Sequence, residues 1–357
     1  MRTRLPVRRA ILERQTYEAP AEGRAGKTRL DFNENTAGCG AAVLRALGKL
    51  TAEQCAMYPE YRKPTARIAR HLGVLPEELL LTNGGDDALR VFFDTFVEPN
   101  TRILICEPTF PMYRYWAEIA GAQIDVCRYD SQMRFPLEEV VAALGKRPRV
   151  FFLANPNNPT GTLVAPAALR RVLKAARRTV VVFDEAYAEF SGFSSLPWIR
   201  RYSHLFVART FSKAAGLAAL RLGAVVAAQD SLALVRRAMP PFPVNLAALV
   251  AAEAAVREGR TIRAYVRNIK RLRASFAAQL AELGVITYPS AGNFLLANFG
   301  PPGPRLFAEL ERRGILLRDR SKDIGPGFVR ITIGTPEEMR KLMEEIRRHW
   351  KARERKD

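Results

Sequence analysis

The segment VFFLANPNNPTGTLVAPAALRRVLKAARRTVVVFDEAY, residues 150–187, decides the fold class. It opens with an apolar run at residues 150–154, continues through a helix-like stretch at residues 165–178, and closes with a second apolar run at residues 180–183. Strands that are apolar along their whole length and alternate with helices indicate a mainly parallel sheet, covered by helices on both faces. Ligands bind such a sheet beyond the carboxyl ends of its strands. Both apolar runs end at polar residues, where we expect a site.

The same alternation continues on both sides of this segment. Further strands are expected at residues 79–82, 102–106, 122–128, 204–208 and 223–228, with helices at 88–96, 112–120 and 137–144. Polar motifs follow these strands too: NGGDD at 83–87, EPTFP at 107–111 and RTFSK at 209–213. Because the carboxyl ends of parallel strands share one edge of a sheet, we expect all these motifs to line one cleft.

The pattern differs at the two ends of the chain. Residues 30–36 read as an extended piece, followed by helices at 41–50 and 64–72. After Pro243 come long helices and short strands, typical of a smaller α+β domain: helices at 245–258, 262–283, 305–313 and 336–349, and strands at 285–288, 293–298 and 329–333. We therefore expect an N-terminal arm of residues 1–35 that joins the small domain, a large domain of residues 36–243 and a small domain of residues 244–357.

The composition argues against several function classes. The net charge is +20, but the arginines are spread over helix-like segments and no nucleic-acid module is present, so attraction of small anionic substrates is favoured over nucleic-acid binding. No apolar run approaches the roughly 20 residues of a membrane span. Four separated cysteines and three histidines do not make a metal site, so no metal is expected.

The N-terminus bears on location. It is basic and has no apolar stretch behind it, so a secretory signal is not expected and the cytoplasm is the predicted location. An Arg-rich organelle presequence is the alternative, against which Glu13 and Glu18 argue.

Lys213 is the candidate nucleophile. It lies in RTFSKAAGLAALRLG, residues 209–223, among small and apolar residues, and only 11 of the 56 basic residues are lysine. Loss of water around the ammonium lowers a lysine pKa and makes the neutral, nucleophilic amine available. Thr210, Ser212 and Arg221 flank it and suit a phosphate. The combination suggests a Schiff-base cofactor that carries a phosphate, which is pyridoxal phosphate. The alternative is a structural lysine at a strand end.

Other strand ends supply what this cofactor requires. Its pyridine nitrogen needs a buried carboxylate, and Asp184 follows an apolar strand, although an aspartate there can also cap a helix. Asn158 and Tyr187, at neighbouring strand ends, are candidate donors to the ring oxygen. Phe110 is the aromatic candidate for the ring face. Gly84-Gly85-Asp86 offers backbone N–H groups at a helix start for the phosphate.

With these residues in place, the chain resembles a fold-type I pyridoxal-phosphate aminotransferase over nearly its full length, and within that group it is most similar to histidinol-phosphate aminotransferases. The motifs that carry the resemblance are NPNNPTG at 155–161, DEAY at 184–187, SKAAGL at 212–217 with Arg221, RDRSK at 318–322, and RITIG at 330–334. The resemblance implies an aspartate aminotransferase-like fold, with a mainly parallel seven-stranded sheet in a large cofactor-binding domain and a smaller α+β domain.

The resemblance also implies roles for individual residues. Lys213 would hold the cofactor as a Schiff base and act as the catalytic base and acid, with Asp184 and Tyr187 as the other catalytic residues. The cofactor-binding set would be Gly85, Asp86, Phe110, Asn158, Asp184, Tyr187, Thr210, Ser212, Lys213 and Arg221, with Tyr58 reaching the phosphate from a second subunit. A homodimer with shared active sites follows from the role of Tyr58.

For substrate binding, the resemblance implies Arg330 for the substrate anion, with Arg318 and Tyr17 helping to bind a phosphate. A surface role is the alternative for Arg318 in this Arg-rich chain. The implied reaction is transamination between histidinol phosphate and 2-oxoglutarate, giving imidazole acetol phosphate and glutamate in histidine biosynthesis. The chain has NENTAG at residues 33–38 where the family usually has NENPYG, which leaves the amino donor open. An aromatic or broad-specificity amino-acid aminotransferase and a threonine-phosphate decarboxylase are the alternatives.

Overall fold

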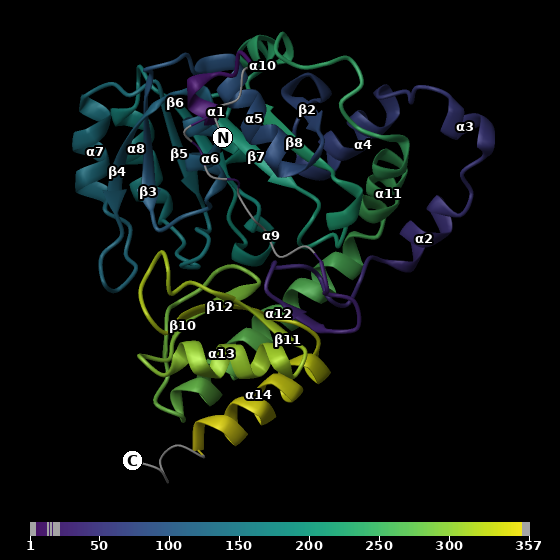
Figure 1. Ribbon diagram of the computed structural model, residues 1–357. Helices are drawn as coiled ribbons and strands as arrows, with labels where there is room; N and C mark the ends of the chain where they lie inside the picture. The colour runs from purple at the N-terminus through teal and green to yellow at the C-terminus, as the bar shows by residue number, and fades with distance from the viewer. Residues whose placement is uncertain (1–4, 13, 15, 17–21, 352–357) are drawn as a thin grey trace.

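The computed structural model describes residues 5–12, 14, 16 and 22–351. Figure 1 shows two packed parts, one built around a large sheet and the other around a smaller sheet with the C-terminal helices. Among the described residues, no helix combines the length and the apolar character needed to cross a bilayer.

The large sheet has seven strands and is mainly parallel, as the sequence predicts. The strands are β2 (Leu79–Thr82), β3 (Arg102–Glu107), β4 (Gln123–Arg128), β5 (Val150–Ala154), β6 (Val180–Asp184), β7 (Leu205–Thr210) and β8 (Gly223–Ala227). Their order is β2-β8-β7-β6-β5-β3-β4. Only β8 runs antiparallel to its neighbours, β2 and β7. The carboxyl ends of β5, β6 and β7 therefore lie side by side at the same edge.

Helices cover both faces of this sheet because its inner strands, such as β5, β7 and β8, are apolar on both sides. In β3, Ile103 and Ile105 belong to one core and Leu104 to the core on the opposite face. The first core is covered by α5 (Gly84–Phe96), α6 (Met112–Ala120) and α10 (Gln229–Arg236). The second is covered by α4 (Arg62–Leu72), α7 (Leu137–Gly145), α8 (Pro166–Ala175) and α11 (Leu246–Arg257).

The smaller sheet contains strands from both ends of the chain. Its order is β1-β11-β12-β10-β9. The bounds are β1 (Thr28–Leu30), β9 (Ile286–Thr287), β10 (Phe294–Asn298), β11 (Ile315–Asp319) and β12 (Phe328–Thr332). It shares a core with α12 (Gly259–Ala281), α13 (Gly303–Arg312) and α14 (Pro336–Lys351). Because β1 pairs in parallel with β11, the N-terminal segment is built into the C-terminal sheet.

Short helices complete the described chain. They are α1 (Arg9–Leu12), α2 (Ala41–Leu47), α3 (Ala52–Ala56), α9 (Ala188–Ser191) and three 3₁₀ turns at Pro76–Glu78, Leu196–Trp198 and Ala218–Leu220. In Figure 1, α2 and α3 extend to one side of the molecule beyond α4 and α11.

Two sequence-based predictions about local structure were wrong, and one strand was missed. The extended piece expected at residues 30–36 is strand only up to Leu30, and β11 was not predicted. Strand β1 owes its pairing to β11, far along the chain, so local periodicity does not reveal it. Strand β11 has the sequence ILLRD, which lacks the period-2 alternation of a half-buried strand. Helix α5 begins at Gly84 rather than Ala88. Gly84 has φ +83°, a conformation that glycine adopts readily, so the chain turns directly from β2 into the helix.

The division into residues 1–35, 36–243 and 244–357 stays a prediction. The packing of α11 bears on it, because this helix lies beyond Pro243 yet contacts α2 and α4. Its buried residues Ala248, Leu249 and Ala252 belong to the core of the large sheet.

Phe152 offers a test of the core beneath the cleft. Its ring is 1% exposed and stacks on Phe93 and Tyr113, at centroid distances of 4.9 and 5.5 Å. Phe152→Ala should lower the free energy of unfolding by about 3–5 kcal/mol through lost burial and a cavity. Denaturant unfolding measures this, with Leu234→Ala as the control because Leu234 is 48% exposed on α10. Equal effects of the two substitutions would contradict the packing described.

Candidate active site

A cavity of about 460 Å³ lies at the carboxyl ends of β5, β6 and β7. Its wall is completed by the start of α5, by arginines of β11 and β12 in the small sheet, and by an arginine in the loop between these two strands. The cavity brings together these residues singled out from the sequence: Gly85, Asp86, Phe110, Asn158, Asp184, Tyr187, Thr210, Ser212, Lys213, Arg221, Arg318 and Arg330. Residues that follow different strands thus meet in one place, as expected for an open parallel sheet.

Lys213 lies in the turn after β7 with its amine in the cavity wall. Its Nζ donates a hydrogen bond to the carbonyl of Phe32 at 2.9 Å. Burial lowers the pKa of Lys213 to about 8, assisted by the positive charges of Arg330 and Arg221 and opposed by Glu34 and Asp86. The neutral amine is therefore far more available than in an ordinary lysine.

Asp184 is a buried carboxylate held in a fixed orientation at the end of β6. Its Oδ2 accepts a hydrogen bond from the Tyr113 hydroxyl at 2.8 Å, and its Oδ1 accepts one from the backbone N–H of Ala186 at 3.0 Å. Burial raises the pKa of Asp184, while these two hydrogen bonds act in the opposite direction. A cation placed beside such a carboxylate relieves the cost of its burial.

The partner of Asp184 was missed in the sequence. Tyr113 is fully buried, and its ring also packs edge-on against Phe110, with centroids 5.9 Å apart. The signal that could have found it is spacing. Tyr113 lies in the first turn of α6, three residues after Phe110, and its backbone N–H donates to the carbonyl of Phe110 at 3.3 Å.

The start of α5 forms an anion cradle. Backbone N–H groups of a first helical turn have no partner within the helix and favour an anion. Thr210 Oγ1 lies 3.0 Å from Ser212 Oγ, and the Arg221 guanidinium lies 3.1 Å from the Asp86 carboxylate. A Cβ on Gly84 would lie 2.5 Å from Arg221 Nη2, so the guanidinium reaches the helix start only because residue 84 has no side chain.

Tyr187 and Asn158 also line the cavity, and each has a partner that the sequence did not indicate. Arg330 Nη1 donates to Asn158 Oδ1 at 2.6 Å, and Asn33 Nδ2 donates to the Tyr187 hydroxyl at 2.8 Å. Because Oδ1 of Asn158 is engaged by Arg330, its Nδ2 is left to donate to a ligand. Burial raises the pKa of Tyr187, so the phenol keeps its proton at neutral pH.

Three arginines from β11, β12 and the loop between them line the cavity. Arg318 and Arg330 meet there as predicted, and Arg320, which had no predicted role, also lines the cavity and is paired with Asp323. Burial and the charges of Arg320 and Arg318 lower the pKa of Arg330 to about 10. The electrostatic interaction with Tyr187 acts in the opposite direction. An anion bound here would interact with several guanidinium groups at once.

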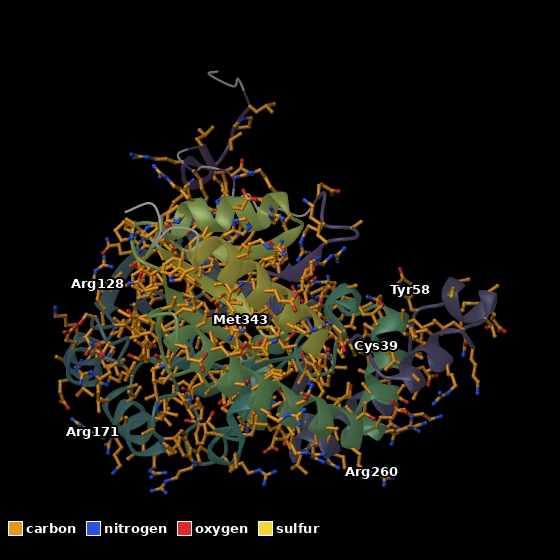
Figure 2. All side chains as sticks on the ribbon, turned by 90° about the horizontal axis from the view of Figure 1, so that it is seen from below. Cys39, Tyr58, Arg128, Arg171, Arg260 and Met343 are labelled. Atoms are coloured by element: carbon orange, nitrogen blue, oxygen red, sulfur yellow. The ribbon has the colours of Figure 1, made fainter. Side chains whose placement is uncertain are left out.

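Two residues singled out from the sequence are not in the cavity wall. Tyr58 is 79% exposed and stacks on Phe242, with centroids 4.3 Å apart. It lies in the projecting part of the chain next to α3, at the edge of the molecule in Figure 2. Its role across a subunit interface stays a prediction. Tyr17 lies outside the described residues.

A family model described as "Aminotransferase class I and II" matches residues 25–346. The chain belongs to this family. Members of the family are pyridoxal-phosphate enzymes, so the aminotransferase reaction class and the cofactor expected from the sequence are confirmed.

Individual relatives agree with this assignment. The chain is 36% identical over 326 residues to a histidinol-phosphate aminotransferase of Geobacillus sp. (strain WCH70), covering 89% of this chain and 88% of that protein. It is 34% identical over 325 residues to histidinol-phosphate aminotransferase 1 of Carboxydothermus hydrogenoformans, covering 89% and 91%. The structure of a histidinol-phosphate aminotransferase from Sinorhizobium meliloti, in complex with pyridoxal-5'-phosphate, has the same fold, with a TM-score of 0.88, 24% identity and coverage of 96% and 98%.

The residues of this aminotransferase fit pyridoxal phosphate. The buried Asp184 carboxylate suits a protonated ring nitrogen, and the cradle at Gly84 suits a phosphate. The amine of Lys213 lines the same cavity as both. The donor set therefore matches the three chemically distinct parts of the cofactor.

The pKa of Lys213 gives a prediction that does not depend on turnover. Arg330→Gln should raise this pKa above about 8, because Arg330 is the main charge that lowers it. The fraction of neutral amine at pH 8, and with it the reaction rate with an amine-directed reagent, should fall. Mass spectrometry of the Lys213 peptide from cofactor-free protein measures the rate against pH. Arg260→Gln, an exposed residue at the edge of Figure 2, should leave it unchanged, and no change with Arg330→Gln would refute the coupling.

Proposed function

We propose that this aminotransferase transfers the amino group of histidinol phosphate to 2-oxoglutarate, giving imidazole acetol phosphate and glutamate. The observation that carries the proposal is the gathering of Arg318, Arg320 and Arg330 in the wall of the cavity that contains Lys213. A donor with a phosphate group needs such a set, whereas a phenylalanine side chain does not. The two curated relatives reported above support the same donor, since both are named histidinol-phosphate aminotransferases.

One site has to accept two different substrates. Arg330 binds the α-carboxylate of glutamate or, in its place, the phosphate of histidinol phosphate, which has no α-carboxylate. A guanidinium group binds either anion through two parallel hydrogen bonds. Arg318 and Arg320 extend the positive region, so the second carboxylate of glutamate also has a partner.

The cofactor is held by residues of the large sheet and its connecting segments. Asp184 pairs with the ring nitrogen, Tyr187 and Asn158 donate to the ring oxygen, and Phe110 covers the ring. The phosphate is bound by Gly85, Asp86, Thr210, Ser212 and Arg221. Pyridoxal phosphate, when bound, supplies an electron sink that stabilises negative charge on the substrate carbon.

Lys213 moves the protons. Its amine is largely neutral above its pKa of about 8 and keeps a neutral fraction below it, so it can accept the proton from the substrate carbon that bears the amino group. The ammonium of Lys213 then donates this proton to the carbon bonded to the other side of the transferred amino nitrogen. The neighbouring charges of Arg330 and Arg221 disfavour the ammonium, which makes it a better acid when it returns the proton.

A comparison of amino donors tests the proposal. Half-reaction spectra at matched concentrations of histidinol phosphate, phenylalanine, tyrosine and threonine phosphate should show the fastest reaction with histidinol phosphate. Arg318→Gln should raise KM for histidinol phosphate roughly 10- to 100-fold, as expected for a lost charge-assisted hydrogen bond. Arg171→Gln is the matched control, because Arg171 is an exposed residue of α8 paired with Glu138.

Each contrary result of that comparison has a distinct meaning. A strong preference for phenylalanine would replace the proposed donor with an aromatic one but leave the cofactor site intact. Release of carbon dioxide from threonine phosphate would indicate a decarboxylase. Retention of both cofactor and turnover by Lys213→Ala would overturn the catalytic role of Lys213 itself.

We also propose that the enzyme is a homodimer with shared active sites and that it is cytoplasmic. Support for the dimer comes from exposed apolar side chains on and near the projecting segment: Leu44, Met57, Tyr58 and Phe242 are 63%, 65%, 79% and 47% exposed. Exposed apolar patches mark protein interfaces. Tyr58 would then complete the phosphate site of the partner subunit.

Subunit mixing tests the shared site. Tyr58→Phe and Lys213→Ala should each lower activity, because each damages both sites of its own dimer. After dissociation and random reassociation of the two variants, mixed dimers should contain one site without either substitution, so activity should recover to about a quarter of the wild-type value. Size-exclusion chromatography confirms that dimers re-form. No recovery in re-formed dimers would show that Tyr58 acts within its own subunit or not at all.

A further inference from the structure

Residues 31–33 each bond to a different side chain of the cavity wall. Arg330 Nη2 donates to the carbonyl of Asp31, Lys213 Nζ donates to the carbonyl of Phe32 at 2.9 Å, and Asn33 Nδ2 donates to the Tyr187 hydroxyl at 2.8 Å. This short segment comes directly after β1 and connects the small sheet to the cavity. Asn33 is the only one of the three that makes its contact through its side chain.

Every hydrogen-bonding group of Asn33 has a partner. The side chain is fully buried, and the backbone has φ +55°, which asparagine tolerates better than most residues. Its N–H donates to Thr332 Oγ1 at 2.9 Å, and its carbonyl accepts from Asn293 Nδ2 at 3.0 Å. Its Oδ1 lies 3.1 Å from Thr332 Oγ1. The side-chain amide of Asn33 therefore has one partner for its oxygen, Thr332, and another for its nitrogen, Tyr187.

Thr332 determines which way this amide faces. A hydroxyl has one proton to donate. Thr332 Oγ1 accepts from the backbone N–H of Asn33 and donates its single proton to Oδ1 of Asn33. The oxygen of the amide therefore faces Thr332, and Nδ2 faces Tyr187.

The same reasoning extends to Tyr187. Its hydroxyl accepts the hydrogen bond from Asn33 Nδ2, so its single proton points away from Asn33. Tyr187 lines the cavity, and burial keeps its phenol protonated. The proton is therefore directed toward whatever acceptor occupies the cavity.

We propose that Asn33 is a positioning residue that makes Tyr187 a donor to the ring oxygen of pyridoxal phosphate, and that Thr332 fixes Asn33 in the orientation that does so. The inference rests on the proposed cofactor site. Asn33 is fully buried and is not among the residues that line the cavity, so it would act through the Tyr187 hydroxyl. The inference also gives the first residue of the NENTAG motif a role in the cofactor site.

Asn33→Asp provides the test, because it keeps the size and the tolerance of positive φ but replaces the donor with an acceptor. The Tyr187 hydroxyl would then donate to the new carboxylate, and the ring oxygen would lose its donor. The pH midpoint of the visible absorbance change of bound pyridoxal phosphate should rise by about one pH unit, the size expected for one hydrogen bond. Asn33→Gly removes the side chain and leaves Tyr187 able to donate in either direction, so its shift should be clearly smaller.

The added charge needs its own control, since charged groups surround this site: Arg330, Asp184 and Asp86 near Tyr187, and also Arg221 and Glu34 near Lys213. Asn35→Asp adds the same charge to the same segment, and Asn35 bonds to the carbonyl of Ala214 rather than to Tyr187. It should shift the midpoint less than Asn33→Asp does. In a Tyr187→Phe background, the excess effect of Asn33→Asp over Asn35→Asp should vanish, because no hydroxyl remains to be redirected.

Thr332 gives an independent test if Asn33→Asp does not fold. Thr332→Val removes the hydroxyl but preserves the shape of a β-branched residue in β12, and it should raise the midpoint; Thr332→Ser keeps the hydroxyl and should not. Thermal unfolding of the cofactor-free variants separates these shifts from a loss of stability. The inference is overturned if Asn33→Asp has no effect, if its effect equals that of Asn35→Asp, or if its excess persists in the Tyr187→Phe background. Absence of bound cofactor in the wild-type protein would instead overturn the proposed function.

Discussion

The cost of removing charged groups from water governs the arrangement of this cavity. Asp184, Lys213 and Arg330 all lie in its wall, and burial shifts the pKa of each toward the neutral form. Each of these charged groups is hydrogen-bonded to a group that carries no charge. Asp184 accepts from the Tyr113 hydroxyl, Lys213 donates to the carbonyl of Phe32, and Arg330 donates to Oδ1 of Asn158. These charges are therefore oriented but not neutralised, so they stay available to a charged cofactor and to anionic substrates.

In one part of the cavity wall the charges are paired. Arg209, near the end of β7, lines the cavity and bonds to Glu185 and Glu189. The Glu185 carboxylate also accepts hydrogen bonds from Ser194 and Ser195. Glu185 follows Asp184 directly, and Arg209 lies four residues before Lys213 in the sequence. The pair thus joins the ends of β6 and β7, which carry the acid and the amine of the site. Breaking a buried pair leaves an uncompensated charge, so these two strand ends are held in register.

The arginines that give this chain its high positive charge lie in two kinds of surroundings, the exposed surface and the cavity wall. Exposed arginines such as Arg128 and Arg171 point outward at the periphery in Figure 2, and both are paired with glutamates, Glu107 and Glu138. Exposed pairs of this kind contribute little to stability. By contrast, Arg318, Arg320 and Arg330 line the cavity, where they would face a bound anion.

The sequence by itself determined the strands and helices around the large sheet, the residues that end its strands, and through them the cofactor. These features are local: an apolar run, a turn motif and a lysine among small residues are each visible within a few positions. Only the tertiary structure decided which side chains pair, because the hydrogen bonds from Tyr113 to Asp184, Asn33 to Tyr187 and Arg330 to Asn158 span 71, 154 and 172 residues. The short strand β1 belongs to the same class, since it pairs with β11 near the other end of the chain. Sequence periodicity carries no information about such contacts, which depend on how the two sheets are brought together.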